Sequence, residues 1–206
     1  MQQFRVATGF AGTPIVLQAL TAVGHHQLAY RMLLEQRCPS WMYAVLMGGT
    51  TIWERWDSML PDGRINPGEM TSFNHYALGS VVNWLHESAG GISPLEPGWK
   101  KILVRPVPGG QLTHATVAYD SPYGKVECAW KLEAHNTFKM SLQVPPNTTA
   151  CVQLPSQQRK DLGSNTGDGT WVGSGHHTFE CVFAEEAWPP EAIMPPFWPQ
   201  PKPICS

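Results

Sequence analysis

Charged residues are scarce in this sequence. Only 15% of its 206 residues are Asp, Glu, Lys or Arg, and the formal net charge is -2. A nucleic-acid-binding surface requires clustered Lys and Arg, whereas the 14 basic residues here are scattered along the chain. The composition therefore predicts no nucleic-acid partner and favours a neutral or weakly polar ligand.

Long apolar runs and metal-binding cysteine patterns are also missing. No stretch reaches the roughly 18 apolar residues that a transmembrane helix requires, so we expect no membrane span. The apolar stretch 6–23 is interrupted by Gly12, Thr13, Pro14 and Gln18, which predicts a packed helix rather than a signal peptide and leaves the compartment undecided. The five cysteines are widely spaced without a CxxC pair, so we expect no metal site and no cofactor.

Tryptophan and proline, by contrast, are abundant. The chain holds nine tryptophans and nineteen prolines, and 42% of its residues are hydrophobic, as in globular proteins. An indole ring is well suited to stacking on the apolar face of a sugar ring. This composition favours a globular protein with a carbohydrate as its ligand class.

Two periodicities divide the sequence. Apolar residues up to about residue 85 follow helical spacing, which predicts helices over 15–23, 28–34, 40–46 with Ser40 as N-cap, and about 72–85. A turn at Gly24 separates the first two helices. Beyond residue 98 the pattern alternates as in strands, with runs at 126–132, 140–144, 150–154 and 177–183 and a loop-rich region from 156 to 175. This part predicts an antiparallel sheet or sandwich.

These changes of pattern divide the chain into three parts. We expect a helical part over residues 1–92, a β domain over 93–184, and a tail over 185–206 that is extended or disordered because of its many prolines. Three or four helices with large apolar faces do not readily bury those faces against one another alone. The helical part is therefore expected to belong to something larger.

The segment TTIWERWD, residues 50–57, has an unusual composition. It places Glu54, Arg55 and Asp57 beside Trp53 and Trp56. Such a run is too polar for a core strand and too apolar for an ordinary surface loop. The segment therefore predicts a binding site.

Glu54 has two possible roles. It follows the flexible pair Gly48-Gly49, which would allow the main chain to present its carboxylate as a general base. The alternative is a structural salt bridge with Arg55 or Arg64, since carboxylates take part in such networks as well.

A second motif, SFNHYALG, covers residues 72–79. It places Asn74 and His75 in the first turn of the predicted helix, where their donors and acceptors could bind sugar hydroxyls. Taken alone, a histidine at this position is more often a capping or core residue, because histidine serves both roles.

Together with PGWKKILVRPVPGG and SPYGKVECAW, the two motifs resemble the C-terminal part of an inverting α-L-rhamnosidase, a glycoside hydrolase. The resemblance extends from about residue 8 to 183. It implies the C-terminal helices of an (α/α)6 barrel followed by an antiparallel β-sandwich, the same order as the two periodicities. It also implies hydrolysis of terminal α-L-rhamnose from glycosides or polysaccharides.

The resemblance assigns roles to residues of both motifs. It implies that Glu54 is the general base and that His75 helps to hold the rhamnose. The other expected substrate-binding or supporting residues are Trp53, Trp56, Arg55, Asp57 and Asn74. An inverting enzyme also needs a general acid about 6.5–9.5 Å from the base, and the family takes it from an earlier segment. The one acid that precedes Glu54 is Glu35, which matches no acid motif of the family.

We therefore expect the chain to be a portion of a longer rhamnosidase. Two alternatives remain open at this point. One is a non-catalytic carbohydrate-binding remnant, inactive alone because the general acid is missing. The other is an incomplete product that folds poorly because half a barrel exposes its core. The sequence does not predict an oligomeric state.

Overall fold

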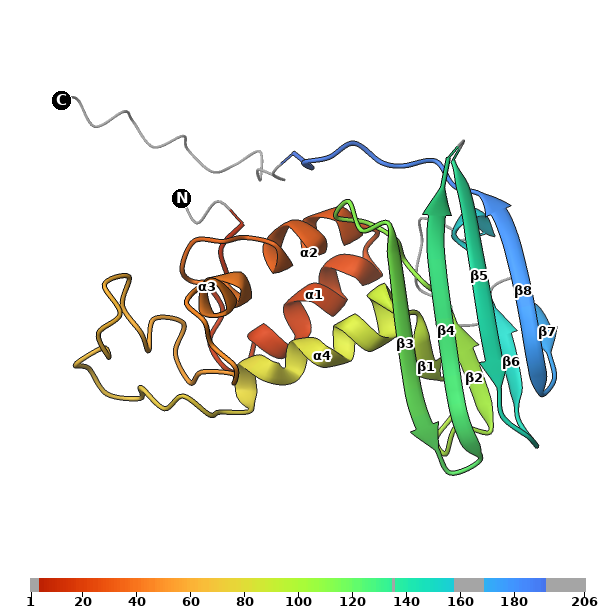
Figure 1. Ribbon diagram of the computed structural model, residues 1–206, viewed down its shortest axis with the longest axis horizontal. Coiled ribbons are helices and arrows are strands. Elements are labelled where there is room, and N and C mark those ends of the chain that lie inside the picture. The colour runs from red at the N-terminus through yellow and green to blue at the C-terminus, as the bar shows by residue number, and fades with distance from the viewer. Residues whose placement is uncertain (1–3, 135, 158–168, 192–206) are drawn as a thin grey trace.

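The structure is a computed structural model that describes residues 4–134, 136–157 and 169–191. A helical part and a two-sheet part lie side by side (Figure 1). Residues 47–76 form an irregular segment that projects from the end of the helical part opposite the sheets. This segment contains most of the motif residues identified from the sequence.

The helical part begins with three separate helices, α1 (Thr13–Ala22), α2 (His26–Leu33) and α3 (Trp41–Leu46). The predicted break between the first two is confirmed at Gly24, whose φ of 82° is one that glycine adopts without strain. Ser40 is confirmed as the N-cap of α3, because its Oγ accepts a hydrogen bond of 3.1 Å from the Tyr43 N–H.

The last helix consists of three consecutive pieces: η1 (Ala77–Ser80), α4 (Val81–Trp84) and η2 (Leu85–Ala89). The prediction that it starts near Ser72, with Asn74 and His75 in its first turn, is wrong. The preceding residues contact another segment: the His75 N–H donates to the Ile52 oxygen at 2.8 Å. Phe73 meets the Trp53 ring edge-on. These tertiary contacts hold residues 72–76 outside the helix.

Among the described residues, the β part contains two four-stranded sheets. One has the order β3-β4-β5-β8 and is antiparallel throughout, with strands at His114–Ser121, Gly124–Glu133, Thr137–Val144 and Gly175–Val182. The other has the order β1-β2-β6-β7, with strands at Ile92–Pro94, Lys101–Val104, Thr149–Val152 and Thr170–Val172. A short helix, η3 (Pro155–Gln157), follows β6.

The predicted alternation is confirmed in the strands, with two corrections in the second sheet. Val126, Cys128 and Trp130 of β4 are all buried on the same face of the strand. However, β2 and β6 pair in parallel, and β7 lies in the region expected to be loop. The parallel pair forms because the chain leaves this sheet for β3, β4 and β5 and then returns to it.

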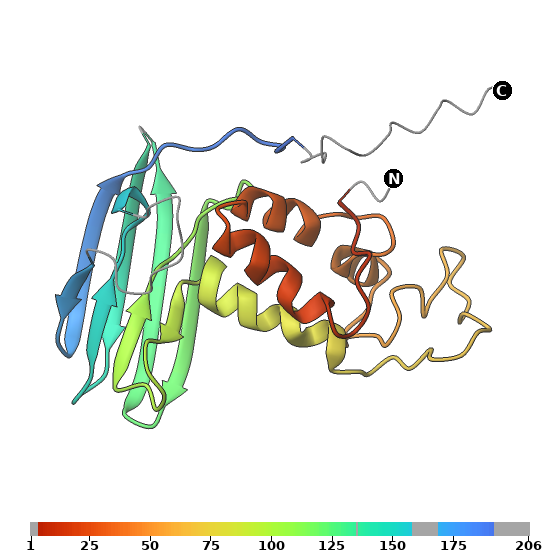
Figure 2. The ribbon, with the colours of Figure 1, turned by 180° about the vertical axis from the view of Figure 1, so that it is seen from behind.

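The helical part lies directly beside the sheets (Figure 2), and side-chain contacts join the two. The Trp130 Nε1–H of the β core donates to the Ala89 oxygen at the end of the last helix, at 2.8 Å. The Tyr30 hydroxyl of α2 donates to the Val107 oxygen, also at 2.8 Å. A Cβ atom on Gly109 would lie 2.5 Å from the Tyr30 ring, so glycine permits this close approach. The helical part is thereby fixed against the sheets.

The chain after β8 returns to the helical part. Residues 183–191 contain no helix or strand and run back toward α2 (Figures 1 and 2). Trp188 packs against the helical core, and the Glu186 carboxylate lies 3.7 Å from the Nε2 atom of His26. The rest of the expected tail, residues 192–206, lies outside the described residues.

Candidate functional site

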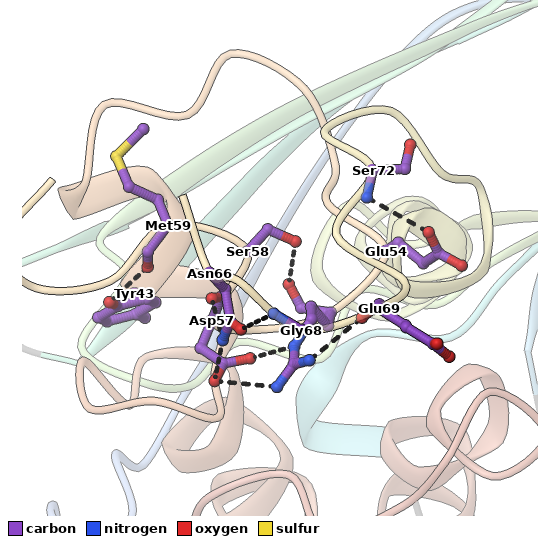
Figure 3. Close-up of polar contacts among 10 residues, drawn as sticks. Tyr43, Glu54, Asp57, Ser58, Met59, Asn66, Gly68, Glu69 and Ser72 are labelled. Atoms are coloured by element: carbon purple, nitrogen blue, oxygen red, sulfur yellow. Dashed lines mark hydrogen bonds and ion pairs between the residues drawn. The ribbon is translucent and has the colours of Figure 1, made fainter. Parts of the chain in front are cut away.

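The two sequence motifs meet in one site. The Glu54 N–H donates to the Ser72 oxygen at 2.9 Å, and the His75 N–H donates to the Ile52 oxygen at 2.8 Å. In return, the Ser72 N–H donates to Glu54 Oε2 at 3.3 Å (Figure 3). Segments 51–54 and 72–75 thus lie side by side, and the Glu54 side chain is held at the junction.

Glu54 takes no part in the salt bridge considered as its alternative role. In the part of the chain that the structure describes, its half-buried carboxylate has no ion-pair partner, and Oε2 accepts the Ser72 N–H. Both candidate arginines pair with aspartates: Arg55 with Asp57, and Arg64 with Asp62, each at 2.6 Å. The Glu54 carboxylate therefore retains acceptor capacity for a proton or a water molecule.

Arg55 and Asp57 form an ion pair that braces the projecting segment. Arg55 also donates from Nη1 to the Glu69 oxygen at 3.2 Å, and Asn66 Nδ2 donates to Asp57 Oδ2 at 3.0 Å. The Gly68 N–H in turn donates to Asn66 Oδ1 at 2.9 Å. The sequence pointed to Arg55 and Asp57 but not to Asn66, which contacts them only through the fold of the segment.

His75 is oriented by its neighbours. Its Nδ1 accepts a 3.2 Å hydrogen bond from the Ala77 N–H, so the proton of the neutral ring lies on Nε2. The ring stacks between Phe10 and Tyr76, with both centroids 5.1 Å away and interplanar angles of 23° and 15°. Phe10 was not identified from the sequence, because it lies far from the motif along the chain.

Asn74 is the most open of the predicted site residues on the second motif. It is exposed, and its side-chain amide makes no hydrogen bond within the described residues. Its backbone N–H, by contrast, donates to Ser72 Oγ at 3.2 Å, which fixes the turn. The Asn74 amide and the Nε2–H of His75 are therefore available to a hydroxylated ligand.

The two tryptophans support the site from within the protein. Trp53 is only 3% exposed and meets the Tyr43 and Phe73 rings edge-on. A Cβ atom on Gly49 would lie 3.0 Å from the Trp53 ring, which explains the glycine before the motif. Trp56 is half-buried and meets Trp41 edge-on at 5.3 Å. Direct contact of either indole with a sugar stays a prediction.

Glu35 is unsuited to be the general acid. Its side chain is buried and forms ion pairs with Arg31 at 3.2 Å and Arg37 at 2.8 Å. The hydrogen bond from Arg37 holds the pKa of the Glu35 carboxyl below its ordinary value. Glu35 is therefore ionised at neutral pH and has no proton to donate.

Two further observations concern metal ions and membranes. Within residues 4–134, 136–157 and 169–191, no three His, Cys, Asp or Glu side chains converge in a way that would hold a metal ion. No helix in the same residues has the length and apolar character needed to span a membrane.

The comparisons with known proteins agree with one another. Residues 1–89 match the bacterial α-L-rhamnosidase six-hairpin glycosidase domain, and residues 91–168 match the bacterial α-L-rhamnosidase C-terminal domain. An α-L-rhamnosidase from Streptomyces avermitilis is 41% identical over 187 residues, which cover 86% of this chain and 18% of that protein.

Solved structures give the same result. The crystal structure of native α-L-rhamnosidase from Aspergillus terreus matches with a TM-score of 0.79 and 49% identity, over 87% of this chain and 20% of that one. The Streptomyces avermitilis α-L-rhamnosidase complexed with L-rhamnose matches with a TM-score of 0.76 and 39% identity, over 86% and 18% of the two chains. The chain thus spans 18% to 20% of the length of these relatives.

Proposed function

The chain belongs to the α-L-rhamnosidase family, and we propose that it supplies the general base and part of the sugar-binding surface for hydrolysis of terminal α-L-rhamnose. The substrates would be rhamnose-containing glycosides or polysaccharides. In this proposal residues 1–92 are the C-terminal portion of an (α/α)6 barrel, 93–184 are the β-sandwich domain, and 185–206 are a tail. The end of the last helix at Ala89 and the start of β1 at Ile92 support the first boundary.

Glu54 is the proposed general base of an inverting reaction. It accepts a proton from a water molecule as the water oxygen attacks the anomeric carbon, and the glycosidic bond breaks on the opposite face. A general acid protonates the leaving oxygen at the same time. The single observation that carries this proposal is the Glu54 carboxylate, held by the Ser72 N–H and without an ion-pair partner among the described residues.

The second motif, SFNHYALG, has the proposed sugar-binding role. Asn74 and the Nε2–H of His75 are donors that lie on the segment joined to Glu54. Hydrogen bonds from these groups to the hydroxyl oxygens of a sugar would position the anomeric carbon relative to the base. Trp53 and Trp56 hold the backbone of the first motif in place for this contact, and Arg55 and Asp57 brace the segment that follows.

In this proposal the general acid comes from an earlier segment of the barrel, because Glu35, the one acid that precedes Glu54, is ionised and paired. Exposed apolar side chains of the helical part, including Ile15 at 62% and Val82 at 54% exposure, offer a surface on which further barrel helices would pack. The second candidate function is sugar binding without cleavage. It is favoured by the free Asn74 and His75 groups, which do not depend on the acid.

A chimera provides the test. The chain replaces the segment that it matches in the Streptomyces avermitilis α-L-rhamnosidase, and hydrolysis of p-nitrophenyl α-L-rhamnoside is measured. We expect Glu54→Gln to lower kcat by about 10²- to 10⁴-fold while L-rhamnose affinity is retained. Glu69→Gln, an exposed acid of the same segment, is the matched control and should leave kcat unchanged.

Two results would contradict the proposal. One is an active chimera in which Glu54→Gln keeps its kcat, which would remove Glu54 as the base. The other concerns the stereochemistry: proton NMR of the first product should show the anomer opposite to that of the substrate. Retention of configuration would exclude the inverting mechanism.

A further inference from the structure

A cavity lies at the end of the helical part that faces the sheets. It has a volume of about 340 Å³ and is walled by α1, η2, β1, β2 and Arg105, the residue that follows β2. None of its lining residues belongs to segment 47–76, which projects from the far end of the helices (Figure 2). The volume lies within the range of about 300–1,000 Å³ that is typical of ligand pockets.

Arg105 gives this cavity an unusual chemistry. It is partly buried, and its guanidinium forms no hydrogen bond or ion pair with any described residue. Four other arginines form ion pairs: Arg31 and Arg37 with Glu35, Arg55 with Asp57, and Arg64 with Asp62. Glu87 acts on this guanidinium only through space and forms no ion pair with it. A partly desolvated cation whose N–H groups lack a bonded acceptor is stabilised by an anion that binds them directly.

The desolvation of Arg105 is evident in its pKa. Burial lowers the pKa of this guanidinium, and the nearby Glu87 carboxylate opposes that effect only through space. The side chain remains positively charged at neutral pH, because an arginine pKa lies far above 7. A guanidinium presents two parallel N–H groups that match the two oxygens of a carboxylate.

The rest of the wall is suited to hydroxyl groups. It contains the hydroxyls of Thr21, Ser88 and Ser93 and the amide of Gln18, and Glu87 adds a further acceptor. Leu95 and Leu103 provide an apolar side. Hydroxyls, amides and carboxylates are the groups that exchange hydrogen bonds with a polyhydroxylated ligand.

We propose that this cavity binds a sugar acid, with the ligand carboxylate on the Arg105 guanidinium and the ligand hydroxyls against Ser88, Ser93 and Gln18. A neutral sugar lacks the group that Arg105 requires. A simple inorganic anion would leave the hydroxyl and amide wall without partners. The site acts independently of Glu54 and does not rest on the proposed rhamnosidase chemistry.

The test is an NMR titration of the 206-residue chain with D-glucuronate, and with D-glucose as the neutral counterpart. We expect glucuronate to shift the backbone amide signals of residues 87–95 and 103–105, and glucose to bind at least about tenfold more weakly, as loss of a charge-assisted hydrogen bond predicts. Equal affinity for the two sugars, or no binding of glucuronate, would overturn the proposal.

Three variants test the role of Arg105 in the same titration. Arg105→Gln should weaken glucuronate binding at least about tenfold, and unchanged affinity would overturn the role of Arg105. Arg105→Lys keeps the charge but loses the paired N–H groups, so its affinity should fall between those of the wild type and Arg105→Gln. Arg64→Gln, remote from the cavity, should bind as the wild type does; a loss as large as that of Arg105→Gln would count against a local site.

Discussion

The helical part and the β part of this chain bury their apolar side chains to different extents. The β part encloses a core that includes Phe138 at 0% and Trp130 at 2% exposure between its two sheets. The helical part has a smaller core around Trp84 and Tyr30, yet leaves Ile15 62% exposed. The β part therefore encloses a core between its own sheets, whereas the helical part presents a surface that is suited to further helices.

The two parts also differ in how they carry function. The strands position their side chains through regular pairing, whereas the Glu54 site lies on a segment whose shape depends on particular contacts. Glu54 and Ser72 exchange hydrogen bonds, and Arg55 and Asp57 brace the chain between them. On this irregular segment the Glu54 carboxylate keeps free acceptor positions. A carboxylate that forms ion pairs with basic side chains on neighbouring strands would lose them.

The largest expected effect is a difference between the two parts in the free energy of unfolding. Phe138→Ala in the β core should lower the free energy of unfolding by about 3–5 kcal/mol, because it opens a cavity in a fully buried site. Val82→Ala, at a position 54% exposed on the helical part, should change it by less than about 0.5 kcal/mol. Denaturant unfolding followed by near-ultraviolet circular dichroism measures both. Equal losses would contradict a core enclosed between the two sheets.

The next effect concerns the exposed helical surface. Ile15→Ser combined with Val82→Ser should weaken association of the chain with the remaining barrel of a relative by tenfold or more, since burial of one such side chain contributes about 1.5–3 kcal/mol. Light scattering of the mixed components reports the association. Val182→Ser, at a residue 74% exposed on β8, is the matched control. A comparable loss in this control would show that the helical surface is not the docking face.

A smaller effect is expected for the pH dependence of the helical part. Hydrogen bonding from Arg37 lowers the pKa of Glu35 in the folded chain. The resulting stabilisation is therefore present above the unfolded value of about 4.3 and is lost as the pH falls through the lowered folded value. Glu35→Gln should flatten the acid side of the curve of unfolding free energy against pH. A variant with the same acid slope as the wild type would rule out this contribution.

Much of the fold follows from local patterns. Gly24 marked the break between two helices and Ser40 marked an N-cap, because both act through their immediate neighbours. The alternation in β4 likewise identified its buried face. The predictions from the sequence were wrong where the structure depends on contacts between distant residues. The start of the last helix depends on Ile52, and the parallel pairing of β2 with β6 depends on the route of the intervening strands.

The site was less accessible to sequence reasoning. Glu54 and His75 were identified by their resemblance to a family, and spacing alone left both with structural alternatives. Phe10, Asn66 and Ser72 were not identified as site residues, because each contacts a motif residue that is distant in sequence. The inward packing of Trp53 depends on Tyr43 and Phe73, which no local pattern connects to it.

The central claim is that this chain carries the general base of a rhamnosidase site, Glu54, but not the general acid. The most direct measurement is p-nitrophenol release from p-nitrophenyl α-L-rhamnoside by the isolated chain, alongside L-rhamnose binding followed by NMR at residues 51–76. The account predicts chemical-shift changes at Asn74 and His75 without p-nitrophenol release. Release by the isolated chain that disappears in Glu54→Gln would contradict it, because the general acid would then have to lie within these 206 residues.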